Sequence, residues 1–139
     1  MGAGISFGCA EATSNIIAGF ILKYFKDKHA LMGCFGLSLI CQLVFFFAGA
    51  NEGGIVAFTA LFVNMLGIGG AFIVIYFMVD QRISSDKSAS AMVIVITVSF
   101  VYASLGPYIA YASQPIPFFT GICTLVVAAL VTLLLPDKN

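Results

Sequence analysis

The spacing of the charged residues constrains the fold of this sequence most strongly. Charged residues occur in short groups, and between these groups lie uncharged runs at 29–51, 53–79 and 88–136, of 23, 27 and 49 residues. A helix that spans a bilayer needs about 20 apolar residues, each adding about 1.5 Å. The first two runs therefore hold one span each. The third holds two, because the prolines of the QPIP sequence at 114–117 interrupt it.

The stretch at 3–22 is also long enough to span a membrane, although it contains Glu11. Of all residues, 61% are hydrophobic and 9% are charged, against about 25% charged in soluble domains. The sequence thus predicts an integral, multi-pass membrane protein in contact with the lipid bilayer. We expect an all-α transmembrane bundle, a single domain over residues 1–139, with five spanning helices at about 3–24, 30–49, 54–79, 88–112 and 117–135.

The basic residues predict the orientation of this bundle. All six Lys and Arg residues fall within 23–29, 80–87 and the C-terminal tail, which five crossings place on one side of the membrane. Basic loops prefer the cytoplasmic side, so the C-terminus is expected to be cytoplasmic. The odd number of spans, with a start on the far side, predicts that an N-terminal half or a membrane partner completes the protein.

Several function classes are excluded by the composition. The net charge is zero and no basic cluster is present, so no nucleic-acid binding is expected. The four cysteines form no CxxC pair, and the single His29 has no partner at metal-ligand spacing. No candidate nucleophile is paired with a residue that could act as its general base. The sequence therefore predicts no enzyme, no metal site and no cofactor.

Glu11 is the most informative polar residue inside a predicted span. It precedes Lys23 by twelve residues, about 18 Å of helix, and so lies near the bilayer midplane. A carboxylate there is costly and should face protein or a water-filled cavity. Asn15 follows four residues later on the same face. The pair either binds a solute or a proton, or makes a buried interhelical hydrogen bond.

The later spans carry weaker signals. Asn64 either contacts a solute or, as the sequence favours, a neighbouring helix. The nearby Gly67, Gly69 and Gly70 predict close helix packing. Gly106 and Pro107 predict a kink, which is either a hinge or a packing feature, with the polar Tyr108 beside it.

In their order and spacing, these motifs resemble the C-terminal part of a major facilitator superfamily transporter, closest to its organic cation/anion branch. The stretches GCAE at 8–11 and KYFKDK at 23–28 resemble the eighth helix and its cytoplasmic loop. Similarly, GIGGAFIVIY at 67–76 resembles the tenth helix, GPYI at 106–109 the eleventh, and LLLPDKN at 133–139 the end of the twelfth. The chain would be a C-terminal fragment of this twelve-helix, major-facilitator-type fold.

The resemblance implies alternating-access transport of a small organic solute, with or without H⁺ or another coupling ion. Glu11, Asn15, Asn64 and Tyr108 would then contact the solute or proton. Gly106 and Pro107 would form a hinge, and Asp80 and Arg82 a cytoplasmic gate. The alternative is a structural subunit that assembles with a larger membrane complex and transports nothing.

Overall fold

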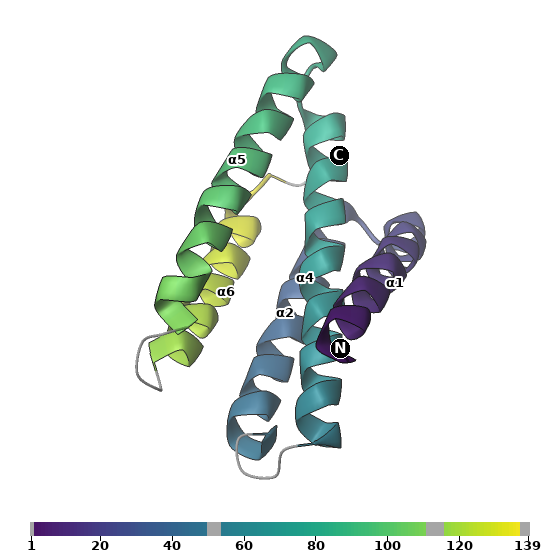
Figure 1. The fold of residues 1–139 in the computed structure, drawn as a ribbon. Helices are drawn as coiled ribbons and strands as arrows, with labels where there is room; N and C mark the ends of the chain where they lie inside the picture. Colours follow the sequence, from purple (N-terminus) through teal and green to yellow (C-terminus); the bar gives the residue numbers. More distant parts are fainter. Residues whose placement is uncertain (1, 50–53, 111–115, 137–139) are drawn as a thin grey trace.

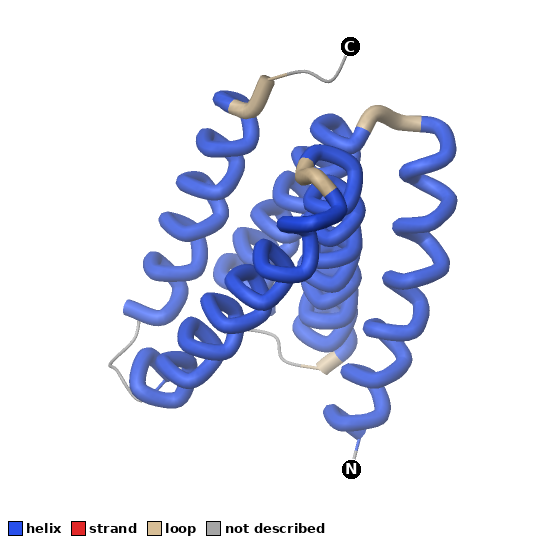
Figure 2. Tube along the Cα trace, turned by 90° about the horizontal axis from the view of Figure 1, so that it is seen from above, coloured by secondary structure: helices blue, strands red, loops and turns tan. Residues whose placement is uncertain are grey.

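The computed structural model describes residues 2–49, 54–110 and 116–136, and within them all side chains except those of 2–8, 11, 48, 49, 57, 102, 103 and 105–110. This part of the chain is helical, without a strand (Figure 2). An all-α fold is therefore confirmed. Its elements are α1 (Gly2–Tyr24), α2 (Asp27–Val44), the π-helical turn η1 (Phe45–Gly49), α4 (Ile55–Arg82), α5 (Ser85–Ala110) and α6 (Ile116–Leu134).

The helix ends follow from local chemistry. Asp27 opens α2, where a carboxylate is favoured by the helix dipole, and its Oδ1 accepts a hydrogen bond from the Lys28 backbone N–H at 2.7 Å. Gly54 precedes α4 with φ at 73°, a left-handed conformation that glycine adopts without strain. The predicted helix at 30–49 is not α-helical throughout, because its last five residues form η1.

Helix α4 is the centre of the bundle. In Figure 1 it runs between α1 on one side and α5 on the other, with α2 behind it, and consecutive helices run in opposite directions. Its most extensive contacts are with α2 and then with α1, while α6 packs against α2. The ends of α1, α4 and α6 that carry the later residue numbers therefore lie at one end of the bundle.

Glycines permit the close packing of α4 against α2, as the sequence predicts. A Cβ at Gly67 would overlap the Ser38 hydroxyl and lie 3.0 Å from the Cys34 carbonyl oxygen. A Cβ at Gly70 would lie 3.1 Å from the Cys34 sulfur. Further along the same interface, a small core forms around the fully buried Val74, with Leu31 and Met78 among its members.

Most large apolar side chains lie outside this core. Phe20, Phe47 and Leu134 are 63%, 70% and 84% exposed, which a soluble surface would not favour. Within the described chain, three helical segments are long and apolar enough to cross a membrane, namely Asp27–Phe47, Phe58–Arg82 and Ile116–Leu134. These features are consistent with a membrane protein.

Candidate functional site

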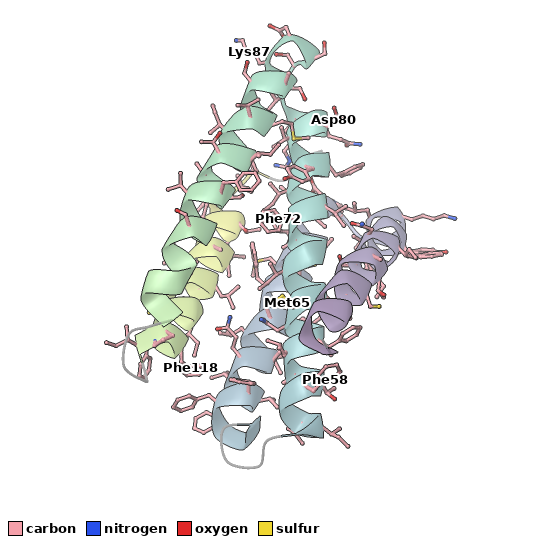
Figure 3. All side chains as sticks on the ribbon, viewed as in Figure 1. Phe58, Met65, Phe72, Asp80, Lys87 and Phe118 are labelled. Atoms are coloured by element: carbon pink, nitrogen blue, oxygen red, sulfur yellow. The ribbon has the colours of Figure 1, made fainter. Side chains whose placement is uncertain are left out.

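A cavity of about 360 Å³ opens between α1, α4 and α5. It lies near the middle of the helices: Asn15, in its α1 wall, is nine residues, or about 13 Å, from the end of α1 at Tyr24. Phe72, in its α4 wall, is labelled at mid-height in Figure 3. The cavity is lined by Ser14, Asn15, Gly69, Phe72, Ile73, Tyr76, Ile96, Ser99 and Phe100.

On one side of this cavity, α1 and α4 pack closely together. A Cβ at Gly69 would lie 2.5 Å from the Ser14 hydroxyl oxygen and 3.0 Å from its Cβ. Ser14 is 1% exposed, so glycine is the residue that lets α4 pack onto this buried serine. The next residue, Asn15, is exposed and carries its amide into the cavity wall.

The cavity wall combines aromatic surface with neutral polar groups. The Phe72 and Tyr76 rings are neighbours, with centroids 6.4 Å apart and an interplanar angle of 36°. The Ser99 hydroxyl donates to the Val95 carbonyl at 2.8 Å and keeps its lone pairs for accepting a further hydrogen bond. The described lining holds no charged side chain. Such a wall suits a small molecule with an apolar body and one or two polar groups.

The two asparagines predicted to contact a solute are not brought together. Asn64 lines another cavity, between α2, η1, α4 and α6, that shares no lining residue with the first. Its backbone carbonyl accepts a hydrogen bond from the Ser38 hydroxyl at 3.3 Å, which is a contact with a neighbouring helix. Its side-chain Oδ1 is buried and has no hydrogen-bond partner among the described residues.

Four predicted site residues cannot be placed in this way. Glu11 lies in α1, and Gly106, Pro107 and Tyr108 lie in α5, but their side chains are outside the described residues. Their predicted roles as a carboxylate site, a hinge and a solute contact therefore stay predictions.

Arg82 joins the end of α4 to the start of α2 and to the segment that follows α6, at the basic end of the bundle. Its Nε and Nη2 donate to Asp27 Oδ2 at 3.0 and 2.8 Å, and its Nη1 donates to the Pro136 carbonyl at 2.7 Å. Lys28 Nζ adds a bond to the Leu135 carbonyl at 2.9 Å. Asp80, the second predicted gate residue, is exposed on α4 near this end (Figure 3). The segments at 23–29 and 80–87 and the segment that leads into the C-terminal tail were predicted to lie on one side of the membrane. In the structure they contact one another.

Sequence reasoning missed Tyr76, Ser99 and Asp27. Tyr76 is seven residues after Gly69, which places both on one face of α4, so the glycine was a usable signal. Asp27 could have been noticed as an acidic residue in a first helical turn. Ser99 had no comparable signal, because other hydroxyl residues of the same helix, Thr97 and Ser104, are exposed and nothing in the sequence distinguishes Ser99 from them.

The described residues contain no group of three or more His, Cys, Asp or Glu side chains that could hold a metal ion. Comparison with known proteins found no matching family model, no matching curated protein and no matching solved structure. A functional assignment therefore depends on the cavity, on the charged end of the bundle and on the sequence motifs.

Proposed function

We propose that the chain is the C-terminal part of a major-facilitator-type secondary transporter and contributes one wall of a pathway for a small organic solute. The observation that carries this proposal is the cavity between α1, α4 and α5. It lies about halfway along the helices, and transporters bind their solutes near the bilayer midplane. A second helical half, either an N-terminal half of the same protein or a membrane partner, would close the other side.

Within this proposal the solute is held by Asn15 and by the polar groups of Ser99 and Tyr76, with Phe72 packing on its apolar part. Glu11 precedes Asn15 by one helical turn and supplies a carboxylate for the solute or for a coupling proton. All five helices cross the bilayer, with the C-terminus in the cytoplasm, as the distribution of Lys and Arg favours.

The contacts of Arg82 support a gate at the cytoplasmic end. Arg82 and Asp27 are 19% and 13% exposed, so their ion pair is only weakly screened by solvent. While it is intact, the pair holds the start of α2 to the end of α4, and the bond from Arg82 to Pro136 adds the segment that follows α6. The exposed Asp80 is free of that cluster and offers a carboxylate to an approaching second half. Rocking of the two halves would alternately form and break such contacts.

The test is uptake of radiolabelled tyramine and of benzoate, as a simple organic cation and anion that both carry hydrogen-bonding groups, by cells that make the chain together with its second half. Glu11→Gln, Asn15→Leu and Ser99→Ala are compared with wild type at equal surface abundance. Loss of one neutral hydrogen bond lowers affinity by about 2- to 10-fold, so Asn15→Leu should raise the half-saturation concentration by that factor. Thr97→Val, on an exposed position two residues from Ser99, is the matched control and should leave uptake unchanged.

The same experiment addresses the structural-subunit alternative. The broad exposed apolar surface of the chain is compatible with packing into a larger complex. If the chain only packs, wild-type cells take up neither probe above background. In that case Glu11→Gln alters only the abundance or assembly of the chain. That outcome would overturn the transport proposal.

A further inference from the structure

A second cavity, of about 590 Å³, lies between α2, η1, α4 and α6. Its volume falls in the range of pockets that hold small organic molecules. Its lining is Cys41, Gln42, Phe45, Phe46, Ala60, Leu61, Asn64, Pro117, Phe118 and Gly121. No helix of the proposed transport pathway other than α4 contributes to it, so its occupant is a separate question.

One part of this wall is aromatic. The Phe46 and Phe118 rings stack with centroids 4.0 Å apart and an interplanar angle of 17°. Phe46 is placed by η1, the π-helical turn at the end of α2, and π-helical turns of this kind are frequent at functional sites. Phe118 marks the end of the bundle opposite Asp80 and Lys87 in Figure 3. A ligand with a flat aromatic ring is a favoured packing partner for these two phenylalanine rings.

The other part of the wall carries two carboxamides, Gln42 and Asn64. The absence of a side chain at Gly121 leaves room for Gln42, because a Cβ on Gly121 would lie 2.8 Å from Gln42 Oε1. Asn64 Oδ1 is the one buried side-chain oxygen or nitrogen without a hydrogen-bond partner among the described residues. Asn64 lines the cavity, and its last side-chain torsion is broad, so a modest rotation brings Oδ1 to a ligand there. A buried acceptor without a donor is costly, so a ligand that supplies one gains affinity.

The charge and access of the cavity limit its ligand further. No charged side chain lines it, so an organic cation or anion would lose its hydration without an opposite charge in return. Phe45 and Leu61 are 43% and 42% exposed at its rim, on the apolar surface that would face lipid. An acyl chain could enter by this route but has no donor for the amides.

We propose that this cavity binds a small neutral aromatic molecule that carries one hydrogen-bond donor and enters from the bilayer. The ring packs on Phe46 and Phe118, and the donor bonds to the carboxamide oxygen of Asn64. This site does not depend on the proposed transport function, because its lining is separate from that of the first cavity.

Indole is a suitable probe, because the chain has no tryptophan and indole fluorescence can be excited selectively. The full chain is reconstituted in lipid nanodiscs, and titrations into empty nanodiscs provide the partitioning background. We expect saturable binding of indole to the wild type. 1-Methylindole, which lacks the N–H donor, should bind about 2- to 10-fold more weakly.

Two variants locate the site. Asn64→Leu keeps the approximate shape of the side chain but removes its amide, so indole and 1-methylindole should then bind equally. Thr59→Val, an exposed position on the same helix, is the matched control and should keep the preference for indole. The comparison of two probes on the wild type needs no variant to fold. Equal binding of the two probes there, or indole signals matching empty nanodiscs, would overturn the proposal.

Discussion

The interface between α2 and α4 allows the sharpest stability prediction, at Gly67. Replacing Gly67 by alanine places a Cβ against the Ser38 hydroxyl, 3.0 Å from the Cys34 carbonyl oxygen and 3.3 Å from the Ser38 nitrogen. Two of these three atoms belong to the backbone of α2 and cannot move away alone. The helices must therefore separate in the interface with α2, which is the most extensive interface of α4.

The magnitude follows from two opposing effects. Overpacking of a tight interface costs about 1–3 kcal/mol. Alanine in place of glycine in a helix interior is worth about 1 kcal/mol in the other direction. Gly36→Ala is the matched control, because a Cβ at Gly36 in α2 meets nothing within 4 Å and gains only the propensity term. The free energy of unfolding of the two variants should thus differ by about 1–3 kcal/mol, with Gly67→Ala the less stable.

The assay is unfolding of the purified chain in dodecylmaltoside micelles by increasing fractions of SDS. Cys34 is 7% exposed in the folded interface, so its alkylation during short pulses of N-ethylmaleimide, read by peptide mass spectrometry, reports opening of that interface. The midpoint for Gly67→Ala should fall below that for Gly36→Ala, and the midpoint for Gly36→Ala should not fall below that of wild type. If the two variants unfold at the same SDS fraction, α2 and α4 do not pack as closely as described.

Two further predictions use the same SDS titration. Arg82→Gln removes the ion pair with Asp27 and the bond to the Pro136 carbonyl, so we expect a loss of about 1–3 kcal/mol. Asp80 is exposed, so Asp80→Asn should change the free energy of unfolding by less than about 0.5 kcal/mol. If Asp80→Asn and Arg82→Gln lowered it equally, the pairing of Arg82 with Asp27 would be contradicted. Gly121→Ala should cost less than about 1 kcal/mol, because its close contacts are with the movable end of Gln42; a loss as large as that of Gly67→Ala would refute this distinction.

The positions of the helices were predictable because charged and proline-containing segments separate apolar runs of membrane-spanning length. The structured ends differ from the predicted ones by a few residues, as at Asp27 and Arg82, where charged residues continue the helix. The π-helical turn at Phe45–Gly49 was not predictable. Nothing in a run of phenylalanines distinguishes an α-helical turn from a π-helical one, and the contact with Phe118 depends on a distant helix.

The candidate site was predictable only in part, because the rotation of each helix is set by its neighbours. Asn15 and Asn64 were both selected as polar residues within apolar helices, yet they line different cavities. The pairing of Arg82 shows the same limit. Asp80 is two residues away and so lies on a different side of the helix, whereas Asp27 reaches Arg82 from a helix 55 residues earlier.

The packing of α4 also indicates where the first cavity can change shape. Glycine contacts and the core around Val74 join α4 to α2, and the Gly69–Ser14 contact joins it to α1. The described part of α5 has far fewer contacts with α4, and Val93, Val98 and Phe100 are 61%, 62% and 73% exposed. Elements with few buried contacts open at lower free energy. We therefore expect entry to the cavity to involve displacement of α5, while α1, α2 and α4 stay together as its fixed wall.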